Sequence, residues 1–347
     1  MKAEIKPRLN LTGRTPLQEV IPLKTPFNII IDPASICNLK CVFCPAGDTS
    51  LVNSLGIYQG EIDFEIYKKI IDQLSLFPDR IKMLRLWKEG EPFLNKKLVE
   101  MVLYAKKSGY VDFIDTTTNG VLMTPDICEK LFDAGINRIN ISIYGINDRQ
   151  YEKYTCCKID FRLLHENIKW AYNNKKSTEI FIKIPENLIT ENEKKEFFGL
   201  FGDYCDRIFV ENLFSSWNSF NVTEDLNFNS KKGIFQQDIQ EKKICPHIFY
   251  NMMINVDGTV SPCFTDWNRK IIVGDVTKQT LLEIWNSSEF NLLRLQHLDG
   301  RRNENLVCGP CNRPSHAMLD NIDDYASQMI KKFIHIPIDR SKKIPGM

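Results

Sequence analysis

The chain has 347 residues with 45 Lys and Arg against 44 Asp and Glu, a formal charge of +1. This balance provides no general electrostatic field for nucleic acid or an anionic membrane surface, so we expect neither as a partner. Hydrophobic residues make up 43% of the chain and charged residues 26%, as in globular proteins, and no apolar run approaches the roughly 18 residues of a membrane span.

Short apolar runs alternate with longer amphipathic stretches between residues 27 and 213, the pattern of βα units around a parallel sheet. The runs predict six strands, at 27–31, 81–87, 113–117, 138–143, 180–184 and 207–213, and the stretches between them predict helices at 64–76, 96–108, 125–134, 161–174 and 191–204. Six units are fewer than the eight of a closed barrel. We therefore expect an α/β fold, a partial (βα)6 barrel open at the side, with ligands at the carboxyl ends of its strands.

The pattern changes after the sixth strand. Residues 218–243 are polar and without a period, which indicates a linker. The run 252–263 predicts a hairpin with a type I′ turn at Asp257-Gly258, followed by a helix at 281–295. Both ends of the chain are expected to be peripheral. The predicted organisation is an N-terminal extension (1–26), the barrel (27–217), the linker (218–243), a small second domain (244–325) and a C-terminal tail (326–347).

Eleven cysteines need an explanation. The first residues lack the apolar stretch of a signal peptide, which predicts a cytoplasmic protein, and cytoplasmic thiols stay reduced rather than forming disulfides. Seven of the cysteines form two groups with ligand-like spacing. The first group is Cys37, Cys41 and Cys44, and the second is Cys245, Cys263, Cys308 and Cys311.

The first group follows the first strand in a Cys-x3-Cys-x2-Cys arrangement. Three thiolates are an odd number for a structural zinc site, which closes with four ligands. They suit a cubane [4Fe–4S] cluster held at three of its four irons, which leaves the fourth iron open to a ligand that is not protein. The alternatives are a zinc site completed by a distant His, or three reduced core cysteines.

This loop resembles the cluster loop of the radical S-adenosylmethionine (SAM) superfamily, and further matches stand at the ends of successive strands. They are Phe43, the Gly90-Glu91-Pro92 turn, Thr118 with Asn119, and Ser142 with Tyr144. The resemblance implies that Phe43 packs against the adenine, that Glu91 receives the methionine amino group, and that the others contact the carboxylate and ribose of SAM. It also implies a 5′-deoxyadenosyl radical that takes a hydrogen atom from substrate, with an external electron donor such as flavodoxin or ferredoxin.

By ligand count alone, the four cysteines of the second group could hold zinc or iron. The sequence around them resembles the auxiliary-cluster domain of the SPASM/Twitch subgroup. The full SPASM form has seven cysteines and two clusters, so four cysteines imply the single-cluster, Twitch-like form and a second [4Fe–4S] cluster. A cluster with four thiolates has no open iron, which leaves electron transfer as its role.

An electron-accepting cluster suits dehydrogenation, because a carbinol radical becomes a ketone once it loses a proton and one electron. The cysteine layout resembles that of aminocyclitol dehydrogenases, and relatives of this layout include sugar epimerases and peptide-modifying enzymes. We therefore expect a small sugar-like or cyclitol substrate that is oxidised or epimerised. Peptide modification is an alternative, weakly disfavoured by the short stretch before the first strand. A zinc-binding interaction protein on a degenerate barrel is another.

Epimerisation would need a hydrogen-atom donor, usually a thiol. Cys128 lies on the apolar face of a predicted helix and Cys205 at the end of another such face, so both are expected in the core. Cys156 and Cys157 lie in a polar stretch after the fourth strand and are the candidate donors; surface thiols are the alternative.

Dehydrogenation would need a base for the hydroxyl proton. Lys183 on the fifth strand and Glu211 on the sixth could reach the barrel interior, although the two could equally form an ion pair across it. His247 follows Cys245 closely, but with four cysteines present we expect it beside the cluster or at the surface rather than as a ligand.

Overall fold

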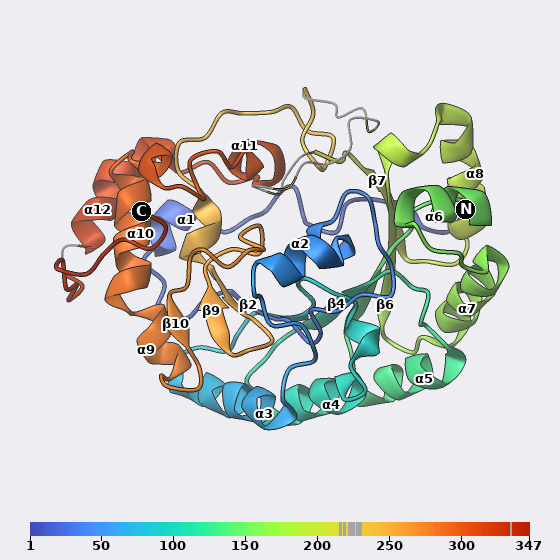
Figure 1. The fold of residues 1–347 in the computed structure, drawn as a ribbon, viewed down its shortest axis with the longest axis horizontal. Helices are drawn as coiled ribbons and strands as arrows, with labels where there is room; N and C mark the ends of the chain where they lie inside the picture. Colours follow the sequence, from blue (N-terminus) through green and yellow to red (C-terminus); the bar gives the residue numbers. More distant parts are fainter. Residues whose placement is uncertain (215–216, 218–219, 221–225, 227–230, 334) are drawn as a thin grey trace.

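The structure is a computed structural model that describes residues 1–347 except 215–216, 218–219, 221–225, 227–230 and 334. Its centre is one sheet of ten strands in the order β1-β7-β6-β5-β4-β3-β2-β8-β9-β10. The sheet curves around an interior that Figure 1 views from one end. Residues 218–219, 221–225 and 227–230 of the predicted linker 218–243 lie outside the described residues.

Six neighbouring strands of this sheet run parallel and form the partial barrel. They are β2 (Asn28–Ile31), β3 (Met83–Leu86), β4 (Ile114–Thr118), β5 (Arg138–Ser142), β6 (Glu179–Pro185) and β7 (Arg207–Glu211). Strands buried on both faces read as nearly continuous apolar runs, which is why the sequence pattern located all six. The predicted α/β fold with a partial barrel is confirmed.

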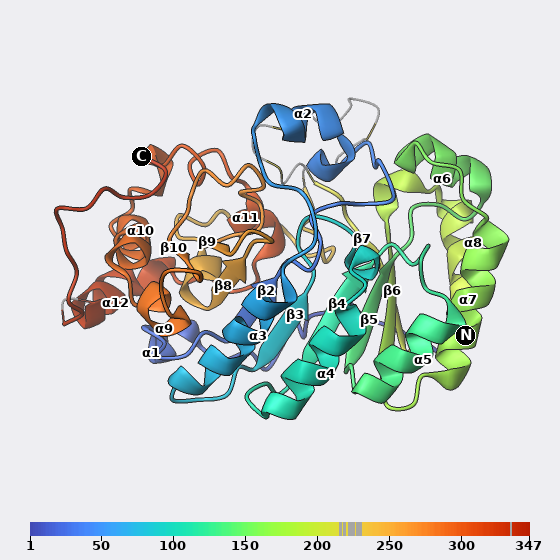
Figure 2. The same ribbon diagram turned by 60° about the horizontal axis from the view of Figure 1, so that its bottom comes forward.

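Helices cover the outer face of the barrel (Figures 1 and 2). They are α3 (Phe64–Asp72), α4 (Leu98–Ser108), α5 (Pro125–Ala134), α7 (Phe161–Asn174) and α8 (Glu191–Phe201). Of the short helices, α2 (Thr49–Ser54) lies across the mouth of the barrel, α1 (Leu17–Val20) lies beside the second domain, and α6 (Asp148–Thr155) follows β5. Local signals set their ends. The hydroxyl of Thr124 caps α5, and Gly135 ends it with a φ of 85°, a conformation that favours glycine.

The barrel sheet continues beyond both of its edges. On one side β1 (Glu4–Ile5) pairs with β7 in parallel, and on the other β8 (Asn251–Ile254) pairs with β2 in parallel. The antiparallel strands β9 (Thr259–Ser261) and β10 (Gly274–Asp275) follow β8. The second domain therefore shares its sheet with the barrel, which the sequence pattern did not indicate.

Two local predictions for the second domain are wrong. The hairpin is present, but positive φ occurs at Gly258 and not at Asp257, whereas a type I′ turn needs it at both central residues. Instead, the N–H of Gly258 donates to the carbonyl of Asn255, so Gly258 is the last residue of a four-residue turn that begins at Asn255. The helix expected at 281–295 is two helices, α9 (Leu281–Trp285) and α10 (Ser288–Leu298), because the Ser287 hydroxyl caps a new helix start.

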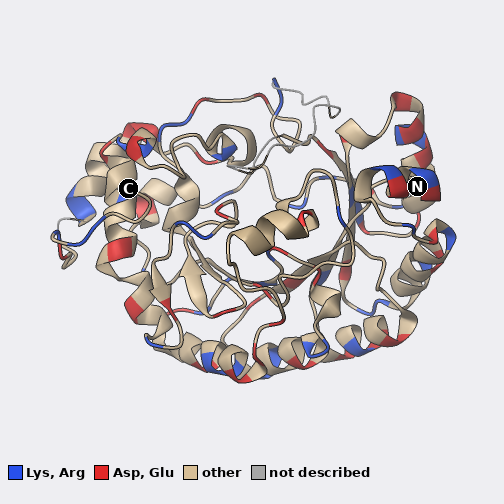
Figure 3. Cartoon of the chain, viewed as in Figure 1, with Lys and Arg blue, Asp and Glu red and all other residues tan. Residues whose placement is uncertain are grey.

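The chain ends were expected to be peripheral, and most of their residues are exposed or half-buried, but parts of both ends are not peripheral. Residues near the N-terminus line the barrel interior, as described below. At the other end, α11 (Arg313–Ala317) precedes α12 (Ala326–Phe333), whose Met329 and Phe333 are buried against the second domain. Charges of both signs are interspersed on the outer helices (Figure 3). No helix in the described ranges has the length and apolarity that crossing a membrane requires.

Candidate active site

A cavity of about 810 Å3 occupies the barrel interior and extends to the second domain. Its wall includes side chains from β2 to β7, from the loop after β2, from the N-terminal segment and from the second domain. Ligands of parallel barrels bind at the carboxyl ends of the strands. The cavity is therefore where the predicted site residues should meet.

Cys37, Cys41 and Cys44 all line this cavity. Their loop is tied to the end of α6, because the N–H of Lys40 donates to the carbonyl of Thr155 at 2.9 Å and the N–H of Val42 to that of Tyr154 at 3.0 Å. These backbone bonds fix the loop without using the thiols. The three sulfur atoms remain available for ligation.

The surroundings of the three thiols fit an iron–sulfur cluster. Burial raises the pKa of Cys37 to about 12 and that of Cys44 to about 11, and burial together with the neighbouring sulfur of Cys44 raises the pKa of Cys41. Without a metal these thiols hold their protons, so ligation must release them. Within the described ranges, no three or more His, Cys, Asp or Glu side chains are placed to hold a single metal ion. Three thiols of one loop that face the same cavity are the ligand set of a cubane with one open iron.

Glu91 sits at the centre of the expected SAM contacts. Its carboxylate is buried and accepts hydrogen bonds from the Thr118 hydroxyl at 2.7 Å, the Asn119 N–H at 2.8 Å and the Phe93 N–H at 3.0 Å. Burial raises the pKa of Glu91 to about 7, although these hydrogen bonds oppose the shift. A buried carboxylate facing a cavity is a suitable partner for an ammonium group.

The other expected SAM residues surround the same space. Phe43, Gly90, Thr118, Asn119, Ser142 and Tyr144 line the cavity, whereas Pro92 is buried behind Glu91 and begins a 3-10 turn. The rings of Phe43 and Tyr144 lie 5.4 Å apart. A Cβ on Gly90 would lie 2.1 Å from the carbonyl oxygen of Ile36. Only glycine therefore allows this turn to pack against the cluster loop.

The second cysteine group lies outside the cavity lining, inside the second domain. Burial raises the pKa of Cys245 to about 12, and the thiols of Cys263 and Cys311 add to this, which shows that the sulfurs are close together. Arg302 donates to the carbonyl oxygens of Cys308 at 2.5 Å and Cys311 at 2.9 Å. A single guanidinium thus fixes both ends of the Cys-x2-Cys turn.

Three side chains of the cavity wall adjoin the second group: His247, Phe264 and Arg313. Burial, then the charges of Arg313 and Arg85, lower the pKa of His247, which keeps its imidazole neutral. His247 was expected beside the cysteines or at the surface; it is buried, and its ring lies 5.8 Å from that of Phe264. The ring of Phe264 in turn lies 5.6 Å from Trp87. No spacing in the sequence indicated this wall.

Lys183 and Glu211 both line the cavity and form an ion pair of 2.6 Å between neighbouring strands β6 and β7. The alternative of an ion pair across the barrel is therefore present, and the same two side chains remain the candidates for the base.

Cys156 and Cys157 lie elsewhere. Cys156 is exposed, Cys157 is half-buried, and neither is among the described residues that line the cavity. They lie near Cys41, beside the cluster loop. Cys128 and Cys205 are buried in the core, as predicted.

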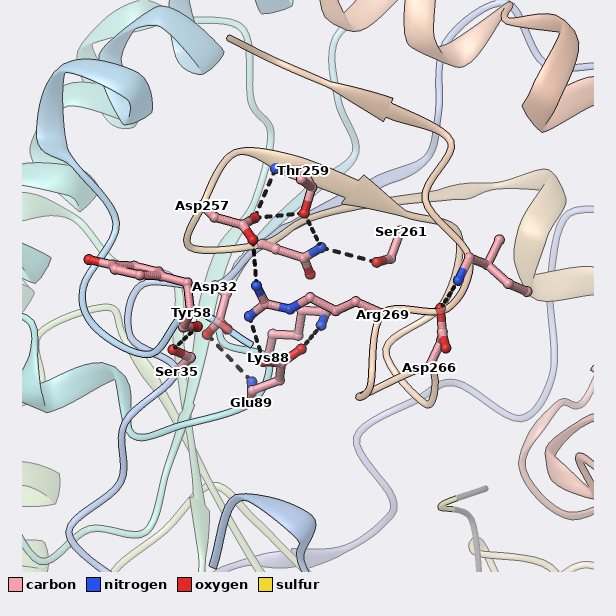
Figure 4. Close-up of polar contacts among 12 residues, drawn as sticks. Asp32, Ser35, Tyr58, Lys88, Glu89, Asp257, Thr259, Ser261, Asp266 and Arg269 are labelled. Carbon is pink, nitrogen blue, oxygen red and sulfur yellow. Dashed lines mark hydrogen bonds and ion pairs between the residues drawn. The ribbon is translucent and has the colours of Figure 1, made fainter. Parts of the chain in front are cut away.

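A polar network joins the barrel to the second domain (Figure 4). Arg269 donates to Glu89 at 2.9 Å and to Asp257 at 2.7 Å, and Glu89 also pairs with Lys88. Glu89 directly precedes the Gly90-Glu91 turn, and Asp257 lies in the hairpin between β8 and β9. The network therefore connects the hairpin of the second domain to the expected SAM site.

Comparisons with known families agree with this geometry. The model of the radical SAM superfamily matches residues 31–190, and that of the SPASM iron–sulfur cluster-binding domain matches residues 245–312. These ranges contain the first and second cysteine groups, respectively.

Among curated proteins, the chain is 23% identical over 297 residues to the S-adenosyl-L-methionine-dependent 2-deoxy-scyllo-inosamine dehydrogenase of Niallia circulans, covering 83% of this chain and 93% of that one. It is 33% identical over 118 residues to the AdoMet-dependent heme synthase of Methanosarcina barkeri, covering 34% of this chain. The chain spans only 31% of the length of that synthase.

Solved structures show the same fold. BtrN in complex with AdoMet and 2-DOIA aligns with a TM-score of 0.55 at 20% identity, over 86% of this chain and 97% of that chain. Streptococcus suis SuiB bound to S-adenosylmethionine aligns with a TM-score of 0.60 at 14% identity, over 80% of this chain and 70% of that one. At these identities the likeness concerns the fold alone.

Proposed function

We propose that this chain, whose residues 31–190 match the radical SAM superfamily and whose residues 245–312 match the SPASM cluster-binding domain, is a radical SAM enzyme that oxidises a carbinol of a sugar-like or cyclitol substrate to a ketone. The observation that carries the proposal is the composition of one cavity. The first cysteine group, Glu91 and the Lys183–Glu211 pair share it, and the second cysteine group lies behind one of its walls.

When bound, SAM and the two clusters supply a 5′-deoxyadenosyl radical that removes the carbinol hydrogen atom, and an acceptor for the one electron that remains. The chain's own residues manage the proton. The Glu211 carboxylate accepts the proton of the substrate hydroxyl, and Lys183, paired with it at 2.6 Å, holds it in position. The rings of Trp87 and Phe264, 5.6 Å apart, line the cavity, and they exclude water from the part of the cavity that they cover.

Oxidation is favoured over epimerisation by the positions of the thiols. An epimerase must return a hydrogen atom to the opposite face of the radical, but neither Cys156 nor Cys157 is among the described cavity-lining residues. The relative from Niallia circulans, which matches 83% of this chain, is named as a dehydrogenase of 2-deoxy-scyllo-inosamine. Both observations support a substrate that loses two hydrogens.

The proposal is tested by anaerobic turnover of the reconstituted enzyme with a chemical reductant, SAM and a panel of sugars and cyclitols. We expect 5′-deoxyadenosine together with a product lighter by two hydrogens. A product of unchanged mass that has taken up deuterium from solvent would indicate epimerisation instead, and turnover of a peptide only would indicate peptide modification. Zinc without iron or sulfide in the anaerobically purified protein would refute the hypothesis that the chain is a radical SAM enzyme.

A further inference from the structure

The arginine side chains that line one part of the cavity carry more positive charge than the neighbouring Asp and Glu side chains neutralise. Four arginines of the cavity lining are called the basic floor: Arg8, Arg85, Arg138 and Arg207. Arg138 and Arg207 are the first residues of β5 and β7, and Arg85 lies level with Arg138 because both are in register with Asp115. Two carboxylates form ion pairs with members of this group. Asp115 lies 2.8 Å from Arg138 and 4.0 Å from Arg85, and Glu179 lies 3.1 Å from Arg207 and 3.8 Å from Arg138. Among the described residues, four guanidinium groups therefore share two carboxylates.

Nearby charges do not remove this excess. Glu211, whose charge also reaches Arg8, is paired with Lys183. Arg85 and Arg138 are 5% exposed, and the Nε atom of each is buried without a hydrogen-bond partner. Uncompensated buried charge is costly, and a protein retains it where a ligand supplies the opposite charge.

Arg8 comes from the N-terminal segment, whereas the other three arginines of the basic floor lie on barrel strands. It follows β1, which pairs with the outer edge of β7, so the chain passes from that edge into the barrel interior. The guanidinium lies 5.4 Å from the centre of the Trp87 ring. No described residue forms an ion pair or a hydrogen bond with the Arg8 guanidinium. Burial, followed by the positive charge of Arg85, lowers the pKa of Arg8 to about 9. A bidentate pair between Arg14 and Asp320 anchors the same segment to the second domain.

We propose that the basic floor binds a phosphate group of the substrate, with Arg8 and Arg85 as its ligands. A phosphate monoester carries about two negative charges near neutral pH, which matches the two uncompensated guanidinium groups, and arginine holds phosphate through paired hydrogen bonds. This inference rests on the proposed function, and it narrows the substrate from a sugar-like molecule to a phosphorylated one.

The dimensions of the barrel agree with this assignment. Arg138 begins β5 and Ser142 ends it, so the floor lies about 13 Å below the expected SAM contacts at 3.3 Å per residue. A sugar whose phosphate binds at the floor therefore has its ring between the floor and the expected SAM site, with a ring carbon facing that site.

The test is calorimetric binding to the anaerobically reconstituted enzyme in the presence of SAM, with inorganic phosphate, glucose 6-phosphate, glucuronate and glucose as probes. We expect phosphate and glucose 6-phosphate to bind more tightly than glucuronate and glucose, and less tightly at higher salt. Arg8→Gln should weaken binding of both phosphate probes about 10- to 100-fold, the loss expected for a charged hydrogen bond. Lys6→Gln is the control, because Lys6 is exposed on the same segment; it should bind like the wild type.

Phosphate binding that is unchanged in Arg8→Gln, absent from the wild type, or weaker than glucuronate binding would overturn the inference. The proposed function is scored separately, by 5′-deoxyadenosine formation. Turnover of unphosphorylated sugars with no phosphate binding would refute the inference and leave the proposed function intact. Phosphate binding that depends on Arg8, with no SAM cleavage on any sugar, would support the floor and refute the proposed function.

Discussion

Glu91 is the residue on which the expected SAM site depends most directly. Its carboxylate is buried, held by three hydrogen bonds and faces the cavity beside the cluster loop. Glu91→Gln keeps the size of the side chain but removes the charge that would pair with the methionine amino group. We expect SAM affinity, measured by equilibrium dialysis on the reconstituted enzyme, to fall about 10- to 100-fold. Glu129→Gln, a change on the exposed face of α5, should leave the affinity unchanged.

The raised pKa of Glu91 also predicts a pH dependence. Burial raises this pKa to about 7, so the carboxyl is increasingly protonated below that pH, and a neutral carboxyl cannot pair with an ammonium. The wild-type dissociation constant for SAM should therefore rise as pH falls below about 7, approaching about tenfold per unit. Glu91→Gln has no proton to gain at this site and should lack the dependence. An equal pH dependence in both proteins would show that another group titrates.

The thiols of Cys156 and Cys157 lie beside the cluster loop, outside the cavity lining of the described residues. We therefore expect Cys156→Ala and Cys157→Ala to change neither the product mass nor the ratio of product to 5′-deoxyadenosine by more than about twofold. A donor role would appear as continued 5′-deoxyadenosine formation with loss of solvent deuterium from the product. That result in either variant would restore the epimerase reading.

At the scale of elements, the hairpin of β8 and β9 is attached to the β3 loop by the guanidinium of Arg269. This side chain is 7% exposed and compensates Glu89 and Asp257, which come from different elements (Figure 4). Removing one partner of a buried pair leaves charge without compensation. We expect Arg269→Met to lower the free energy of unfolding by about 3 kcal/mol, as measured by denaturant titration.

Arg301→Met is the matched control. Arg301 pairs with Glu304 at 3.3 Å, but its side chain is 45% exposed. Exposed pairs contribute about 0–1 kcal/mol, so this variant should stay within that range. Equal losses in the two variants would mean that the Arg269 contacts do not attach the hairpin.

On the scale of the whole molecule, the two domains share a sheet rather than only facing each other. Four residues of β8 pair in register with four residues of β2, at the edge of the barrel. Removing residues 244–347 would expose the apolar strand β2, Asn28–Ile31, as an unpaired edge, and exposed apolar edges aggregate. We expect the 1–243 fragment to be insoluble or aggregated in size-exclusion chromatography. A monomeric fragment with a cooperative thermal transition would show that the barrel folds by itself.

Much of this molecule follows from local sequence. The six barrel strands were predicted because each is an apolar run bounded by turn residues. Both ends of α5 were predicted because Thr124 and Gly135 are strong capping residues. The two cysteine groups and the residues around Glu91 were found from their spacing. Parallel strands bring their carboxyl ends to one edge, so short motifs far apart in the sequence meet there.

The N-terminal residues show where local sequence is insufficient. β1 has two residues, too few to carry a period, so nothing in the sequence placed Arg8 inside the barrel. The pairing of β8 with β2 was missed for a related reason, because both strands are apolar runs and neither run specifies its neighbour.

The amino-acid order by itself determined the chemistry available to this protein: which side chains can ligate iron, where strands end and where helices begin, because these properties depend on a few consecutive residues. Only the tertiary structure decided how that chemistry is distributed. It paired Lys183 with Glu211, left Cys156 and Cys157 beside the cavity, and placed four arginines against two carboxylates. These arrangements depend on contacts between residues far apart in the chain, which short-range spacing and periodicity do not encode.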